Sequence, residues 1–104
     1  MNIFTRSIDI SSRMLTELRL QIDLSHVGYR TAADVLALSK RPVIFSHSNA
    51  RALCDSLRNI PDELIVAAAR TGGTVGATLW PPMVKHASRP TIDDWAAQID
   101  YLVN

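Results

Sequence analysis

Short apolar runs alternate with amphipathic segments along the whole chain. The predicted strands cover residues 20–26, 43–47 and 74–80, and the predicted helices cover residues 10–19, 31–39, 61–70 and 91–104. Strands that alternate with helices are typical of βα units around a parallel sheet rather than of hairpins. The pattern therefore predicts an α/β fold with three parallel strands and flanking helices.

Capping signals mark where two of these helices begin. Thr31 with Asp34, and Thr91 with Asp94, have the three-residue spacing of a capping box. In the last helix the apolar residues share one face, which we expect to be buried. They are Trp95, Ile99 and Leu102.

Proline and glycine mark the other boundaries. Pro61 suits the first position of the third helix, and Gly72 or Gly73 is expected to end it after Arg70. Two prolines at 81–82 end the third strand, and the residues that follow them are predicted to form a loop as far as residue 90.

Composition limits the classes of function that the chain can serve. Its 104 residues have a mass of 11.5 kDa, which fits one domain. Eleven basic residues oppose ten acidic ones, without a basic cluster, and only six residues are aromatic. This balance gives no electrostatic signal for nucleic acid or an anionic membrane surface, so neither is expected as a partner.

The single cysteine and the N-terminal residues bear on the compartment. Cys54 alone excludes an internal disulfide and a thiolate metal cluster, and it is expected to be a small buried hydrophobic residue. The first residues lack the pattern of a signal peptide, and no run approaches the ~20 apolar residues of a membrane span. The compartment is left open, with a reducing one favoured; as it stands, the chain is expected to be soluble, untargeted and cytoplasmic.

Two successive predicted strands end in the same dipeptide, Ser25-His26 and Ser46-His47. The histidines are 21 positions apart, which is one βα step. Successive parallel strands lie side by side, and their carboxyl ends open onto the face where α/β enzymes place their sites. Because alternation puts each histidine on the apolar face of its strand, we expect the two imidazoles to converge.

A converging pair of imidazoles is half of a zinc site. Structural zinc has four protein ligands and catalytic zinc has three plus water. The further candidates, Asp23 and Asp55, lie on the opposite strand face and in a loop. The alternative is that each histidine makes a local hydrogen bond; the repeated placement favours metal binding. His86, outside any motif, is interpreted as a surface histidine.

Three segments together resemble the bacterial branch of the membrane (renal) dipeptidase family of zinc peptidases. They are DLSHVGYRT at residues 23–31, PVIFSHSN at 42–49 and RNIPDE at 58–63, in the order and at the spacing of that family. The similarity continues through the glycines at 72–76, Trp80-Pro81-Pro82 and the last helix. It covers the chain from about residue 15 onward.

The resemblance implies a (β/α)8 barrel whose two-zinc site hydrolyses dipeptides. It assigns His26 and His47 as ligands of the second zinc and Arg58 as the residue that binds the substrate carboxylate. A guanidinium suits that role because it binds a carboxylate through two parallel hydrogen bonds. Without the motif, Arg58 is interpreted as a solvated loop residue. The family's first-zinc ligands, bridging glutamate and proton-transfer aspartate have no counterpart in this segment.

A whole barrel takes ~250 residues, so residues 1–104 are expected to form a single partial barrel with three of eight strands, the fifth to the seventh. The apolar side chains of Ile22, Leu24, Val43 and Phe45 are expected to form an uncovered inner face. The chain is therefore expected to be marginally stable, to form a homo-oligomer or to need the rest of the barrel. The alternative to a dipeptidase segment is an inactive remnant or interaction module that self-associates through its sheet edges. A third possibility is that the sequence is a cut piece of a longer chain.

Overall fold

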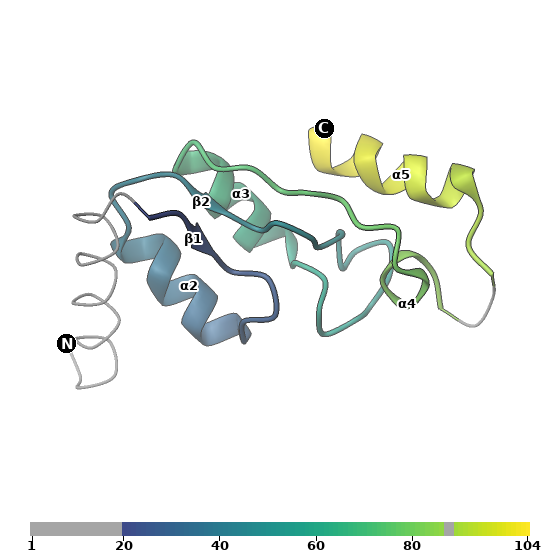
Figure 1. Ribbon diagram of the computed structural model, residues 1–104, viewed down its shortest axis with the longest axis horizontal. Coiled ribbons are helices and arrows are strands. Elements are labelled where there is room, and N and C mark those ends of the chain that lie inside the picture. The colour runs from purple at the N-terminus through teal and green to yellow at the C-terminus, as the bar shows by residue number, and fades with distance from the viewer. Residues whose placement is uncertain (1–19, 87–88) are drawn as a thin grey trace.

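The computed structural model describes residues 20–86 and 89–104, so the helix predicted over residues 10–19 lies outside the described residues. The elements are β1 (Ile22–Asp23), α2 (Tyr29–Leu38), β2 (Val43–Ile44), α3 (Asp62–Arg70), α4 (Pro81–Val84) and α5 (Ile92–Val103). They form an elongated mixed α/β unit with principal extents of 42 × 23 × 20 Å (Figure 1).

The strands are parallel, as predicted, but shorter. β1 pairs with β2 in the register Ile22 to Val43. On the other side of β2, Phe45 forms a parallel bridge with Val75, and the Gly76 N–H donates to the Phe45 carbonyl at 2.7 Å. The third predicted strand is therefore a single bridge.

Beyond this bridge, the backbone at Thr78 is hydrogen-bonded by the side chain of Asn49 and not by a neighbouring strand. The Asn49 carboxamide accepts from the Thr78 N–H at 2.9 Å and donates to the Thr78 carbonyl at 3.0 Å. Asn49 is completely buried, and it replaces the neighbouring backbone that a longer ladder needs.

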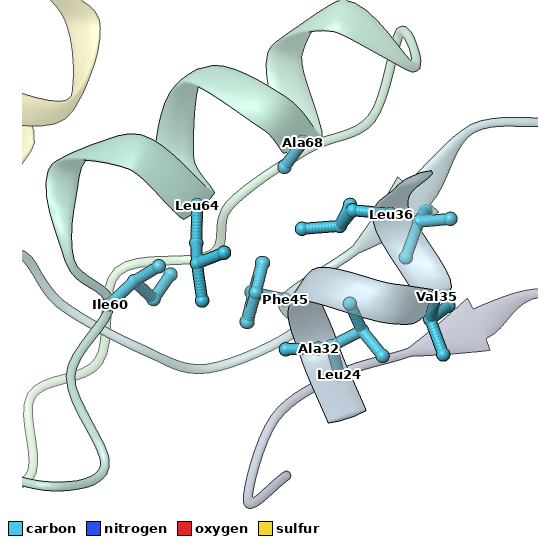
Figure 2. Close-up of a cluster of buried hydrophobic side chains, with 9 residues drawn as sticks. Leu24, Ala32, Val35, Leu36, Phe45, Ile60, Leu64 and Ala68 are labelled. Atoms are coloured by element: carbon cyan, nitrogen blue, oxygen red, sulfur yellow. The ribbon is translucent and has the colours of Figure 1, made fainter. Parts of the chain in front are cut away.

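The core lies between the short sheet and the two helices α2 and α3 (Figure 2). Leu24 and Phe45, which directly follow the two strands, pack with Leu36 of α2 and Leu64 of α3. The expectation of an uncovered apolar inner face is wrong for Leu24, Val43 and Phe45, because the helices cover them. The opposite face of the strands carries Asp23 and Ser46, both exposed.

The predicted start of α2 is wrong. The helix begins at Tyr29 with Gly28 as its N-cap, and Thr31 lies inside its first turn. The Gly28 backbone is extended, and its carbonyl already accepts the Ala32 N–H at 3.0 Å. The backbone thus begins the helix before Thr31 can cap it.

Helix α3 follows its local signals closely. Pro61, predicted as the first helical residue, is instead the N-cap, because its backbone is extended. Asp62 and Glu63 lie in the first turn, where the helix dipole stabilises a carboxylate. After Arg70 the chain turns at Gly72, whose φ is 78°. The Gly72 and Gly73 N–H groups donate back to the carbonyls of the last turn, so the helix ends in a Schellman motif, as glycine there predicts.

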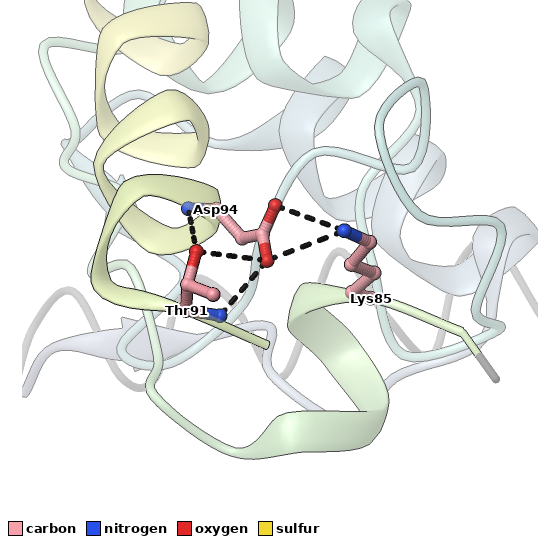
Figure 3. A network of polar contacts seen from close by, with 3 residues as sticks. All are labelled: Lys85, Thr91 and Asp94. Carbon is pink, nitrogen blue, oxygen red and sulfur yellow. Dashed lines mark hydrogen bonds and ion pairs between the residues drawn. The ribbon is translucent and has the colours of Figure 1, made fainter. Parts of the chain in front are cut away.

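Helix α5 has the predicted capping box (Figure 3). The Thr91 hydroxyl accepts from the Asp94 N–H at 3.2 Å, and the Asp94 carboxylate accepts from the Thr91 N–H at 2.8 Å. Lys85 also donates to Asp94 at 3.3 Å. These hydrogen bonds and the nearby ammonium lower the pKa of Asp94, the Thr91 amide having the largest effect.

Two predictions for the C-terminal part need correction. Residues 81–84 form the short helix α4, because prolines fit a first turn whose N–H groups have no helical partner. The buried residue of α5 is Gln98, whose side chain accepts from the Ala50 N–H at 2.8 Å. The predicted apolar face is only partly covered, and Ile99 is 37% exposed. None of the described helices is long and apolar enough to cross a membrane.

Candidate metal and substrate site

A left-handed turn places His26. β1 ends at Asp23, and the Val27 N–H then donates to the Leu24 carbonyl at 3.2 Å. His26 within this turn has a φ of 65°, a conformation that is uncommon for residues other than glycine. The predicted reason for convergence, strand alternation, is therefore wrong for His26, because the strand has already ended.

The two histidine side chains nevertheless come together, as the repeated dipeptide predicted. Their Nε2 atoms are 2.6 Å apart, with ring centroids at 4.6 Å and ring planes tilted by 54°. The His47 N–H donates to the Ser25 hydroxyl at 3.0 Å, which ties the two Ser-His dipeptides to each other. Both imidazoles are exposed to solvent.

Asp23 supports this arrangement from the neighbouring strand. One oxygen of its carboxylate accepts from the Ser25 N–H at 2.9 Å and from the Ser46 N–H at 3.1 Å. Its other oxygen accepts from the Ser46 hydroxyl at 2.5 Å. Desolvation raises the pKa of Asp23, but these hydrogen bonds outweigh it and lower the pKa to about 2. Asp23 therefore binds the two serines, and no ligand role is assigned to it.

Ser46 links Asp23 to the histidine pair. Its hydroxyl oxygen lies 2.7 Å from Nδ1 of His47, on the side of the ring opposite the contact with His26. A carboxylate, a hydroxyl and an imidazole thus form a continuous chain of hydrogen bonds. Partners of this kind orient histidines in metal sites.

The loop that carries Arg58 is held by two neighbours. Arg51 donates to the carbonyls of Ser56, Leu57 and Asn59, and the buried Asn59 side chain donates to the carbonyls of Cys54 and Met83. These bonds satisfy loop carbonyls that would otherwise lack partners. Arg58 itself is left exposed at the tip of the loop.

Arg58 lies at the edge of a cavity that it shares with His26. The cavity has a volume of about 290 Å³, and its walls include Phe45, Ile60 and Leu64. The Arg58 guanidinium carbon lies 5.1 Å from the ring centroid of Trp80. Stacking on an aromatic face leaves the N–H groups at the guanidinium edge available for an anion.

The remaining candidates lie apart from the histidine pair or serve other roles. Cys54 is 3% exposed, as predicted, and burial raises the pKa of its thiol. His86 is exposed and lies 2.8 Å from the Asp55 carbonyl through Nε2. Within residues 20–86 and 89–104, no group of three or more histidine, cysteine or carboxylate side chains has metal-binding geometry.

The histidine pair fits one half of a zinc site. Two solvent-exposed imidazoles bring their Nε2 atoms into hydrogen-bond contact, and imidazole nitrogen is a preferred zinc ligand. Zn–N bonds of about 2.0–2.1 Å place two nitrogens of a tetrahedral ion roughly 3.3 Å apart, so the two rings must separate slightly when the metal binds. Sequence reasoning missed the roles of Asp23, Ser46 and Trp80. The serine that precedes each histidine was the available signal, but its partner depends on the register between the strands.

Comparison with known proteins identifies the family. Residues 13–104 match the family described as membrane dipeptidase, peptidase family M19. The chain belongs to this family. The resemblance inferred from the three motifs is confirmed.

Relatives within the membrane dipeptidase family are much longer than this chain. An uncharacterized dipeptidase of Schizosaccharomyces pombe is 36% identical over 91 residues, which are 86% of this chain and 22% of the relative. Dipeptidase 3 of Homo sapiens is 46% identical over 65 residues, which are 62% of this chain and 13% of the relative. The chain thus spans less than a quarter of the length of either relative.

A solved structure of similar fold carries a ligand. The metallopeptidase of Rhodobacter sphaeroides, crystallised with a phosphinate mimic of the dipeptide L-Ala-D-Ala, superposes with a TM-score of 0.85 at 25% identity. The superposition covers 91% of this chain and 28% of that protein. The folded unit described above is therefore similar to one segment of a metallopeptidase.

Proposed function

We propose that this chain supplies part of the active site of a zinc-dependent dipeptidase. The observation that carries the proposal is the juxtaposition of His26 and His47, with Nε2 atoms 2.6 Å apart, beside a cavity that also reaches Arg58. Membership of the membrane dipeptidase family supports the same reaction class. A small cavity with a cation at its edge suits a substrate as short as a dipeptide.

His26 and His47 hold the second zinc of a two-zinc site in this proposal. Zinc bound there would supply an activated water and would polarise the peptide carbonyl. The chain's own contribution is to present the Nε2 atoms of two imidazoles side by side. The ligands of the first zinc, the bridging carboxylate and the proton-transfer group have no counterpart in this chain, and in this proposal other segments of a complete barrel would supply them.

Arg58 binds the free carboxylate of the dipeptide. Its guanidinium is charged at any working pH and donates two parallel hydrogen bonds to a carboxylate. The bonds from Arg51 and Asn59 hold the backbone of the loop, which reduces the conformational entropy lost when substrate binds.

The fold proposed for the whole protein is a (β/α)8 barrel, of which this chain forms three consecutive βα units. The parallel pairing of β1, β2 and the segment at Val75 supports it. In this account, β1 continues the sheet toward the preceding barrel strand. Family membership favours the dipeptidase segment over the self-associating remnant.

A chimera tests the function directly. Residues 20–104 replace the superposable segment of the Rhodobacter sphaeroides metallopeptidase, and hydrolysis of L-Ala-D-Ala is measured with and without zinc. We expect zinc-dependent hydrolysis that is lost in the chimera carrying both His26→Ala and His47→Ala. The matched control is His86→Ala, which removes a histidine outside the site and should leave hydrolysis unchanged.

Folding of each chimera is checked by circular dichroism and by its thermal unfolding midpoint. A folded double variant that hydrolyses the dipeptide as fast as the parent chimera, with the same zinc content, would contradict the assignment of both histidines.

A further inference from the structure

We propose that Asp23 and Ser46 are positioning residues that fix the tautomer of His47, so that its Nε2 atom carries the free lone pair. The hydrogen-bond chain Asp23–Ser46–His47 lies behind the imidazole, away from His26. The effect of this hydrogen-bond chain on metal binding rests on the proposed zinc function. The assignment of the His47 tautomer does not depend on that function.

The charge of Asp23 determines which atom donates in each hydrogen bond of the chain Asp23–Ser46–His47. An ionised carboxylate only accepts hydrogen bonds. Its Oδ2 atom lies 2.5 Å from the Ser46 hydroxyl oxygen, so the single hydroxyl proton of Ser46 lies between them. Ser25 offers Ser46 another acceptor, but at 3.4 Å it is much the weaker one.

The proton on His47 follows from this direction. Because Ser46 donates its proton to Asp23, its oxygen faces His47 with lone pairs. Nδ1 of His47, at 2.7 Å, must then carry a proton and donate it. A neutral imidazole has one N–H, so Nε2 of His47 is the acceptor nitrogen.

The two histidines are therefore not equivalent. His47 has its tautomer fixed by Ser46, whereas within the described residues no hydrogen bond is found at Nδ1 of His26. In the metal-free pair, His26 donates from Nε2 to His47 across 2.6 Å. When a metal binds, His26 is the ring that must change its tautomer, and His47 is already in the ligand form.

Replacement of Asp23 by asparagine reverses the hydrogen bond between residue 23 and Ser46, and with it the one between Ser46 and His47. Both backbone amides, of Ser25 and Ser46, donate to Oδ1, which asparagine retains as a carbonyl oxygen. Its Nδ2 replaces the oxygen that accepts from the Ser46 hydroxyl, and it donates to Ser46 instead. The hydroxyl proton of Ser46 then turns toward Nδ1 of His47, and the imidazole proton moves to Nε2.

The experiment is a long-range ¹H–¹⁵N correlation spectrum of the histidine rings in the 104-residue chain at pH 8, together with zinc titration by calorimetry. We expect Nδ1–H for His47 in the wild type and Nε2–H in Asp23→Asn, with zinc affinity reduced ~10–100-fold in that variant. Ser46→Ala should release the tautomer, and Ser46→Thr, which keeps the hydroxyl, should restore it. Asp55→Asn is the matched control and should change neither readout.

Two results would overturn the inference: a wild-type His47 protonated at Nε2, or a tautomer that Asp23→Asn leaves unchanged while the chain stays folded. The zinc titration separates this inference from the proposed function. If the tautomer shifts as expected but no variant binds zinc, the hydrogen-bond chain is upheld and the metal assignment fails. If zinc binds but Asp23→Asn leaves the tautomer of His47 unchanged, the metal assignment is upheld and the inferred role of the hydrogen-bond chain fails.

Discussion

Trp80 supports the Arg58 guanidinium from a loop 22 positions further along the chain, with the guanidinium carbon 5.1 Å from the ring centroid. The two residues follow β2 and the Val75 segment, which lie side by side. An aromatic face below the guanidinium restricts its motion and attracts its charge. Trp80 is thus a positioning residue for the proposed carboxylate contact.

Removal of this ring should weaken substrate binding. Cation–π contacts at exposed sites contribute about 0.5–1 kcal/mol, so Trp80→Ala in the chimera should raise KM about two- to fivefold. Trp80→Phe, which keeps an aromatic face, should raise it less. Steady-state kinetics on L-Ala-D-Ala measure this. An unchanged KM in a folded Trp80→Ala chimera would show that the contact has no role in binding.

The pKa of Asp23 sets how stability depends on acid. Its folded-state pKa is about 2, below the ordinary 3.8, so the ionised form is the one that the fold stabilises. This contribution is fully present above about pH 4 and is lost as the pH falls from 4 toward 2. The free energy of unfolding measured in urea should fall over this range more steeply for the wild type than for Asp23→Asn. If this free energy falls equally with pH in both proteins, Asp23 is not the source of the acid sensitivity.

Gly76 allows the third strand segment to approach β2. A Cβ atom at this position would lie 2.2 Å from the Ser46 carbonyl oxygen, which is part of the backbone and has little room to move. Gly76→Ala should therefore destabilise the fold by about 1–3 kcal/mol. Gly28→Ala is the control for steric crowding, because nothing lies within 4 Å of its Cβ position. Its cost should be limited to the poorer N-cap that alanine gives α2. Equal unfolding midpoints for the two variants in urea would contradict the close approach.

The capping box of α5 gives a test of the C-terminal part. Thr91→Ala removes the hydroxyl that accepts from the Asp94 N–H at 3.2 Å. Loss of such a cap costs about 0.5–2 kcal/mol, and Thr91→Ser should retain most of it. Urea denaturation followed by tryptophan fluorescence, with Trp95 in the same helix, reports the difference. If the alanine and serine variants have the same urea midpoint, the cap does not stabilise the helix.

Local signals made the helices predictable. Pro61 and Gly72 bound α3, and the box formed by Thr91 and Asp94 begins α5, because each signal acts within one helical turn. The signal at Thr31 failed for the same kind of reason: a competing local choice, the extended backbone at Gly28, begins α2 earlier. The parallel order of the strands also followed from the alternation of strands and helices.

What the sequence left open depends on contacts between distant segments. Alternation shows that Leu24 shares a strand face with Ile22, but whether helices or missing strands cover that face is a tertiary property. Likewise, the pair Ser25-His26 and Ser46-His47 predicted convergence, whereas the left-handed turn at His26 and the bond from Ser46 to Asp23 required the register of β1 against β2.

Zinc binding by the 104-residue chain tests the central claim most directly. Isothermal titration is run on the wild type, on the variant with both His26→Ala and His47→Ala, and on His86→Ala. The account predicts one zinc bound by the wild type and by His86→Ala, with binding abolished in the double variant and the ring signals of His26 and His47 shifted by the metal. Equal binding by the double variant, or zinc binding that leaves the ring signals of His26 and His47 unshifted, would contradict the claim that these two histidines form half of a zinc site.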